Sequence, residues 1–231
     1  MQVLNKYKKT ITESLLFQDM SAAEIGQLMP YLSLEGYEYT KGSFIECDNE
    51  KFSYTAFLPK KLYILLEGLV HLIIEDSYGR RLMAQQYEAG DVLAGTLFDV
   101  PTEKLFAGYQ TIKNSVVASV SFESIMNMQD LPNKVTIKML KNLCLFFADD
   151  RIKLYKRLEC VSRICIRERI KFYLLDQKYR AGKDKFVLPI TKNDMANYLS
   201  VSRSSMTREL AAMKKEKLIN FKAREFTLFF K

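Results

Sequence analysis

Residues 190–221 have the sequence ITKNDMANYLSVSRSSMTRELAAMKKEKLINF. Thr191 is a favourable N-cap, and Asp194 three residues later completes a capping-box-like pair at the start of a helix. The inner face of this short helix is expected to consist of the apolar residues Met195, Ala196 and Leu199. The small side chain of Ala196 allows a second helix to cross closely at that point. The pattern predicts a first helix that packs against a crossing partner.

A second helix follows after a tight turn at Ser200 and Val201, with the Val201 side chain expected in the core. Ser202 is placed to cap this second helix. Its buried face is expected to consist of three apolar residues at helical spacing, Met206, Leu210 and Met213. Two helices with this turn and this spacing predict a helix-turn-helix.

The opposite face of the second helix is polar and basic. Its first two turns place four residues on the solvent side: Arg203, Ser204, Thr207 and Arg208. The early turns of a recognition helix contact base edges, and arginine is the most common bidentate partner of guanine. Lys214 and Lys215 extend the positive surface where phosphates would lie. The sequence therefore predicts a double-stranded DNA interface, with two packed helices and a solvated basic face as the alternative.

The charge distribution agrees with this prediction. Residues 159–231 contain 17 Lys and Arg against 8 Asp and Glu, a net charge of +9. The other 158 residues contain 18 and 19, a net charge of −1. Excess positive charge confined to one region is typical of a nucleic-acid-binding module. The segment NFKAREFTLFFK that follows the two helices fits a β-hairpin wing.

The preceding residues divide into two regions of different pattern. From about Gly36 to Val120, short apolar and β-branched runs alternate with glycine-containing turns, which predicts a closed or double-layered β structure. From Leu131 onward the chain has no glycine until Gly182, and apolar residues recur at steps of three and four, with Arg151 as the one interruption. These seam residues are Ile137, Leu140, Cys144, Phe147, Leu154 and Leu158. They predict a long helix that dimerises, although a helix lying on its own domain would also carry an apolar stripe.

Together these motifs resemble the CRP/FNR family of transcriptional regulators. YLSVSRSSMTREL is similar to the recognition-helix signature of the family, LEGLVHLIIEDSYGRRL followed by YEAGDVLA resembles its β-roll, and SRICIRERIKFYLL resembles its first DNA-binding-domain helix. The last segment is expected to direct apolar side chains into a core, namely Ile164, Ile166, Ile170, Tyr173 and Leu174.

The resemblance implies an α+β fold with three parts. These are an effector-sensing, double-stranded, jelly-roll-like β-roll over residues 1–130, a central dimerisation helix over 131–158 and a winged helix-turn-helix over 159–231. It places base contacts on Arg203, Ser204 and Arg208, with Ser202 near the phosphate backbone. It also implies a homodimer on an inverted-repeat operator, allosteric control by a small effector, and RNA polymerase as a partner. Activation and repression are both compatible with the sequence.

The sequence departs from the family pattern both in the helix-turn-helix and in the segment expected to bind the effector. The turn carries Ser200 where glycine is usual, and Ser204 replaces a glutamate that reads a base in many members. Residues 90–110, GDVLAGTLFDVPTEKLFAGYQ, contain no arginine to pair with the phosphate of a cyclic nucleotide, so cyclic AMP is disfavoured. The effector is unidentified, and the candidates for its pocket are Gly95, Thr96, Leu154 and Tyr155.

No metal, cofactor or catalytic residue is predicted. His71 is the one histidine, and the four cysteines lack metal-binding or disulfide spacing, so they are expected to be structural thiols in the cytoplasm. No apolar run approaches the roughly 20 residues of a membrane-spanning helix. Two alternatives remain: a ligand-independent DNA-binding dimer, and a cupin-like enzyme with a DNA-binding tail.

Overall fold

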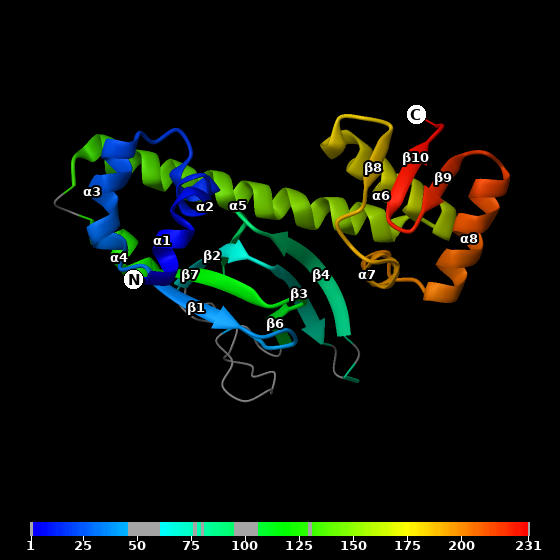
Figure 1. The fold of residues 1–231 in the computed structure, drawn as a ribbon, viewed down its shortest axis with the longest axis horizontal. Helices are drawn as coiled ribbons and strands as arrows, with labels where there is room; N and C mark the ends of the chain where they lie inside the picture. The colour runs from blue at the N-terminus through cyan, green and yellow to red at the C-terminus, as the bar shows by residue number, and fades with distance from the viewer. Residues whose placement is uncertain are drawn as a thin grey trace. The chain divides into compact units, whose positions relative to one another are not determined.

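The computed structural model describes residues 2–45, 61–75, 78–79, 81–94, 106–128 and 131–230. The chain separates into two compact units, residues 1–152 and 153–231. The division runs through the long helix α5, Asn133–Ser162, so this helix contributes residues to both units (Figure 1). We describe each unit by itself.

The N-terminal unit begins with short helices and continues as antiparallel strands. The helices are α1 (Gln2–Lys6), α2 (Lys8–Thr12), the 3-10 turn η1 (Leu15–Phe17), α3 (Ala22–Leu32) and, after the strands, α4 (Phe122–Met126). The strands are β1 (Glu35–Tyr39), β2 (Lys61–Glu67), β3 (Leu69–Glu75), β4 (Arg81–Glu88), β5 (Val92–Ala94), β6 (Phe106–Thr111) and β7 (Ser115–Ser121).

The strands form two antiparallel sheets, one in the order β1-β7-β2-β5 and one in the order β4-β3-β6. Apolar side chains of both sheets, among them Tyr63, Val70 and Tyr87, share one core. Gly68 connects β2 to β3 with a φ of +112°, and a Cβ there would lie 2.2 Å from the Ser115 hydroxyl oxygen. Only glycine therefore fits between the two sheets at this position. The predicted α+β architecture with a double-layered β domain is confirmed.

A second core of this unit lies between the first sheet and the helices. The alternate residues Leu62, Ile64 and Leu66 of β2 pack in it together with residues of α2 and α3. The first part of α5 contributes its own buried stripe, Val135, Met139, Leu143 and Phe146. One face of α5 is thus buried in the core of the N-terminal unit.

The C-terminal unit has one apolar core. It is built from the end of α5, α6 (Ile166–Ala181), β8 (Lys185–Val187), α7 (Lys192–Tyr198), α8 (Arg203–Lys215), β9 (Ile219–Lys222) and β10 (Glu225–Leu228). The last two strands form a hairpin, and β10 also pairs with β8, so the sheet order is β8-β10-β9. The predicted wing is this hairpin.

One residue that was expected in the core of this unit is exposed. Ile170, Tyr173 and Leu174 are buried and Ile166 packs against the core, but the side chain of Ile164 is 97% exposed. The reason is that α5 ends at Ser162 and α6 begins only at Ile166. Ile164 therefore lies in the connecting bend and not on the inner face of a helix.

Candidate nucleic-acid interface

Helix α7 begins with the predicted capping box. The Thr191 hydroxyl accepts a hydrogen bond from the backbone N–H of Asp194 at 3.2 Å, and the Asp194 carboxylate accepts one from the N–H of Thr191 at 3.3 Å. Two N–H groups without intrahelical partners are satisfied in this way. The inner residues of the helix are buried as predicted: Met195, Ala196 and Leu199.

The turn between α7 and α8 closes the first helix in a Schellman motif. The N–H of Val201 bonds to the carbonyl of Ala196 at 3.0 Å, and the N–H of Ser200 bonds to that of Asn197 at 3.1 Å. Such a motif requires a left-handed residue, and Ser200 has a φ of +54°. Ser200 therefore carries backbone strain at a position where glycine would carry none.

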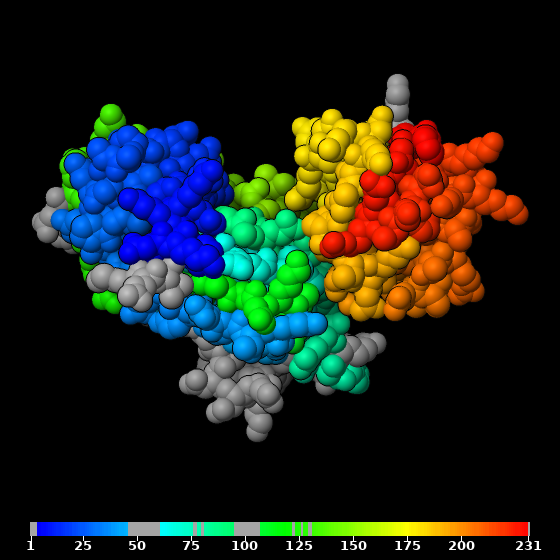
Figure 2. Space-filling view, in the orientation of Figure 1, coloured from blue at the N-terminus to red at the C-terminus, as the bar shows by residue number. Residues whose placement is uncertain are grey.

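Helix α8 has a buried face and an exposed face. The Ser202 hydroxyl caps it by accepting from the N–H of Ser205 at 3.1 Å. The residues on its inner face are fully buried: Met206, Leu210 and Met213. The predicted DNA-contacting residues are all exposed: Ser202, Arg203, Ser204, Thr207, Arg208, Lys214 and Lys215. In the space-filling view, α8 lies at the surface of its unit (orange in Figure 2).

Hydroxyl groups organise the first turns of the exposed face. The Ser202 hydroxyl lies 3.1 Å from that of Ser204 and 2.8 Å from that of Ser205. The Arg208 guanidinium donates to the Ser205 hydroxyl at 3.4 Å, so this arginine is directed back along the helix towards its N-terminus. The Thr207 hydroxyl donates to the carbonyl of Arg203 at 2.8 Å.

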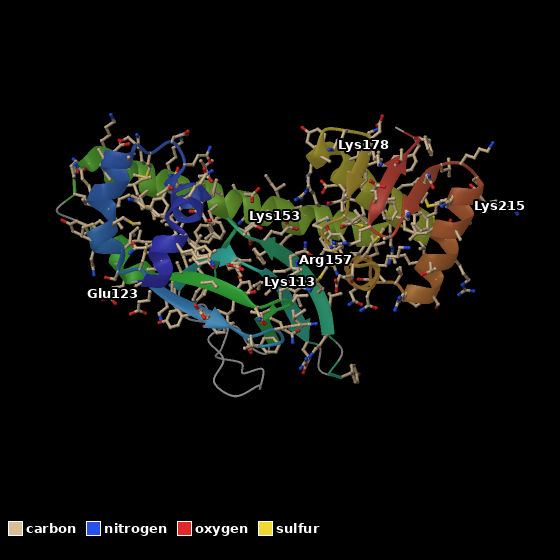
Figure 3. All side chains as sticks on the ribbon, viewed as in Figure 1. Lys113, Glu123, Lys153, Arg157, Lys178 and Lys215 are labelled. Carbon is tan, nitrogen blue, oxygen red and sulfur yellow. The ribbon has the colours of Figure 1, made fainter. Side chains whose placement is uncertain are left out.

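The two predicted phosphate-contacting lysines differ in their surroundings. Lys214 donates to the carbonyl of Phe221 in the wing at 3.2 Å, and its ammonium lies 5.2 Å from the centroid of the Phe221 ring. Lys192 contacts the same ring at 4.3 Å. Lys215 instead extends away from α8 into solvent (Figure 3). Of the pair, Lys215 is the more available to a phosphate.

An ion-pair cluster that the sequence did not predict lies on the other side of α8. Arg167 of α6 donates to Glu216 through two nitrogens at 2.8 Å each and to Glu209 at 2.5 Å. The hydrogen bonds that Arg167 donates to Glu216, and next the one that it donates to Glu209, raise the pKa of Arg167. The available signal was the spacing of seven between the two glutamates, which places them on one face of α8. The cluster fixes α8 to α6.

The predicted effector residues are only partly described. Leu154 and Tyr155 lie on α5 with 40% and 61% of their side chains exposed, whereas Gly95 and Thr96 lie outside the described residues. A polar contact between the β domain and α5 was not foreseen: the Asp150 carboxylate accepts from the Gln85 amide at 2.8 Å and from the Tyr87 hydroxyl at 3.1 Å. Burial raises the pKa of Tyr87, which keeps this phenol protonated as the donor.

In the described part of the chain, no group of three or more His, Cys, Asp or Glu side chains is placed to hold a metal ion. His71 is buried, with its Nε2 atom 3.2 Å from the Gln86 side-chain oxygen. Cys144, Cys160 and Cys165 are free thiols, and Cys47 lies outside the described residues. None of the described helices is both long and apolar enough to span a membrane.

Comparison with known proteins agrees with this geometry. Residues 168–228 match the family model of the Crp-like helix-turn-helix domain. A search of curated proteins gives no significant match.

Several solved structures share the fold over most of the chain. FixK2 from Bradyrhizobium japonicum is 22% identical and superposes with a TM-score of 0.62, covering 86% of this chain and 94% of its own. The c-di-GMP-responsive global regulator CLP of Xanthomonas campestris is 14% identical, with a TM-score of 0.66 and coverages of 91% and 100%. A cyclic nucleotide-binding domain containing protein from Listeria monocytogenes EGD-e is 16% identical, with a TM-score of 0.66 and coverages of 88% and 97%. Residues 168–228 of the C-terminal unit are therefore similar to the Crp-like helix-turn-helix domain, and the chain has the fold of solved CRP/FNR-type transcriptional regulators.

Proposed function

We propose that this protein is a homodimeric transcriptional regulator that binds a specific DNA sequence under the control of a small effector. The observation that carries the proposal is the division of α8 into two faces. Its inner residues are fully buried, while the first two turns of its outer face expose two arginines and several hydroxyl groups beside a capped N-terminus. This division is what a helix inserted into the major groove requires.

In the proposed complex, Arg203 and Arg208 read guanine through paired hydrogen bonds. Ser204 and Thr207 lie on the same exposed face, where a hydroxyl or a methyl group can contact a base edge. Ser202 is placed beside the phosphate backbone, and Lys214 and Lys215 neutralise phosphates further along the groove. The net charge of +9 on residues 159–231 supports such a surface.

The proposed dimer forms through α5. All seam residues of this helix are exposed, and they lie on a different face from its buried stripe. The exposed fractions of five of them are 64% for Ile137, 44% for Leu140, 41% for Phe147, 40% for Leu154 and 64% for Leu158. A second copy of the helix would remove this apolar surface from water. Two-fold symmetry then predicts an inverted-repeat operator with half-sites about one helical turn apart.

For the proposed effector, Leu154 and Tyr155 of α5 are the described candidates for contact. The CLP structure, which has this fold, is that of a regulator responsive to c-di-GMP, so a nucleotide effector is one class to consider. Cyclic AMP is not proposed, because residues 90–110 carry no arginine for its phosphate. We further propose RNA polymerase as a partner, the cytoplasm as the compartment and no enzymatic activity.

The test is the selection of binding sites from random DNA by the parent protein, Arg208→Ala and Lys215→Ala. The parent is expected to enrich an inverted repeat. Arg208→Ala should lose about 1–3 kcal/mol of affinity and relax the preference at one position of each half-site. Lys215→Ala should weaken binding to all sequences alike and flatten its salt dependence, because a phosphate contact carries no base information.

Two results would contradict the proposed reading face. One is that the parent enriches no palindromic sequence. The other is that Arg208→Ala selects the same motif with unchanged affinity.

A further inference from the structure

The end of α7 presents three backbone carbonyls that the helix itself does not satisfy. The Schellman motif uses the carbonyls of Ala196 and Asn197, which leaves those of the following residues, Tyr198, Leu199 and Ser200. The negative end of the helix dipole falls at the same place, so cations are favoured there. Two arginines from earlier in the chain occupy it.

The first of them is Arg157, near the end of α5. It is 6% exposed, and its Nη1 atom donates to the carbonyl of Tyr198. Its Nη2 atom donates to the Ser200 hydroxyl at 3.3 Å, and its guanidinium lies 4.9 Å from the centroid of the Tyr198 ring. Figure 3 shows Arg157 on α5 beside α7. One planar group thus contacts a carbonyl, a hydroxyl and a ring of the same turn, which the point charge of a lysine cannot do.

The second is Arg169 of α6, which donates to the carbonyls of Leu199 at 3.2 Å and Ser200 at 3.5 Å. Its Nε atom donates to the carbonyl of Arg163 in the bend between α5 and α6, at 3.0 Å. The Cys160 thiol donates to the carbonyl of Arg169 itself, at 3.6 Å. Residues 153–162 of α5, the start of α6 and the α7–α8 turn therefore form one connected network.

The α7–α8 turn combines a strained backbone conformation with the cap of the next helix. Ser200 holds a left-handed conformation that costs a non-glycine residue free energy, and Ser202 must cap α8 two residues later. A small change at Ser200 would therefore reorient the first two turns of α8, which carry Arg203 and Arg208. Burying a guanidinium beside this turn is itself unfavourable unless its hydrogen bonds are complete.

We propose that Arg157 is a positioning residue for DNA recognition, which holds the α7–α8 turn in its strained conformation and connects the end of α5 to the recognition helix. The inference rests on the proposed DNA-binding function. It adds a residue that touches no DNA and yet determines how precisely α8 presents its arginines. It also means that residues 153–162 of α5 move with the helix-turn-helix.

The experiment compares the full-length parent with Arg157→Lys and with the control Arg163→Lys. Arg163 belongs to the same unit, pairs with Glu159 and stacks on Phe172, so it tests the loss of an arginine–aromatic contact away from the turn carbonyls. Affinities are measured by fluorescence anisotropy for the selected operator and for unrelated DNA. Hydrogen exchange of the peptide that contains Ser200 and Val201 is measured without DNA.

Arg157→Lys is expected to bind the operator about tenfold more weakly, since one charged hydrogen bond is lost, and to bind unrelated DNA as the parent does. The amides of Ser200 and Val201 should exchange faster. Arg163→Lys should change neither quantity. Ser200→Ala removes only the hydroxyl partner of Arg157, so it should show a smaller operator-specific loss, and it provides the test if Arg157→Lys does not fold.

Equal losses on operator and unrelated DNA, or unchanged exchange in the turn, would overturn the proposal. If the parent prefers no DNA sequence, the proposed function fails with it. Exchange in the turn, which needs no DNA, separates that failure from the failure of the Arg157 contact alone.

Discussion

Cys160 shows how the end of α5 is packed at the level of a single side chain. It is fully buried, and its thiol is a hydrogen-bond donor to the backbone of α6. Burial raises the pKa of Cys160 to about 11, although Arg157 and Arg169 nearby act in the opposite direction. At neutral pH the residue is a protonated thiol, which suits a structural role and not a reactive one.

We therefore predict that Cys160 reacts slowly with iodoacetamide. Only the thiolate attacks, so at about pH 8 the exposed Cys165 should be alkylated well before Cys160. The rate at Cys160 should rise with pH towards about 11 for as long as the domain stays folded. Mass spectrometry of peptides from a time course measures both rates. Equal rates for the two cysteines in the native protein, with equal rates also in urea, would contradict the burial of Cys160.

At the scale of the element, α7 and α8 end in the same way. The N–H of Leu218 bonds to the carbonyl of Met213 at 3.0 Å and that of Lys217 to Lys214 at 3.1 Å, which is again a Schellman motif. Its left-handed residue is Lys217, with a φ of +59°. Neither helix has glycine at this position, and both therefore carry backbone strain.

Lys217→Gly is expected to stabilise the protein by about 0.5–1 kcal/mol, because glycine adopts this φ without a steric cost. The matched control is Lys215→Gly, in the last turn of α8, which should destabilise the protein by about 1 kcal/mol. Urea unfolding of the parent and both variants measures the two free-energy differences. A loss of stability in both variants would show that the strain at Lys217 is not released.

At the scale of the whole molecule, α5 carries two apolar faces. One is buried in the N-terminal unit through residues such as Met139 and Phe146, and the other is exposed through Ile137, Leu140 and Phe147. Near its C-terminal end, the same helix also contacts the α7–α8 turn through Arg157. The exposed apolar face is therefore a surface available to a partner.

We expect the parent to be a dimer in solution and Phe147→Glu to dissociate it, because a carboxylate would be buried in the seam. The matched control is Leu145→Glu. Leu145 is 39% exposed, close to the 41% of Phe147, but lies roughly 160° around the helix. Sedimentation should show a weakened dimer for Phe147→Glu and an unchanged one for Leu145→Glu. A monomeric parent, or equal dimerisation of all three proteins, would refute the interface.

Local signals in the sequence were sufficient for the helix-turn-helix. The Thr191 and Ser202 caps and the inner residues of α7 and α8 were predictable, because each depends on residues within one or two turns. The left-handed φ of Ser200 was indicated only by the family resemblance, in which glycine is usual at this position. Ile164 was placed wrongly for a related reason. Its apolar character fits a helix face, and the bend that exposes it depends on where α5 stops.

The sequence by itself determined the succession of a β-rich region, a long helix and a helix-turn-helix, and the basic face of α8, since these follow from local periodicity, capping and charge. It did not determine which apolar stripe of α5 packs inward, because periodicity identifies a buried face without naming its partner. Nor did it reveal that Arg157 reaches Tyr198 and Ser200, 41 and 43 residues away. Contacts of this range exist only once the chain has folded, so the tertiary structure alone decided what holds the turn of the helix-turn-helix.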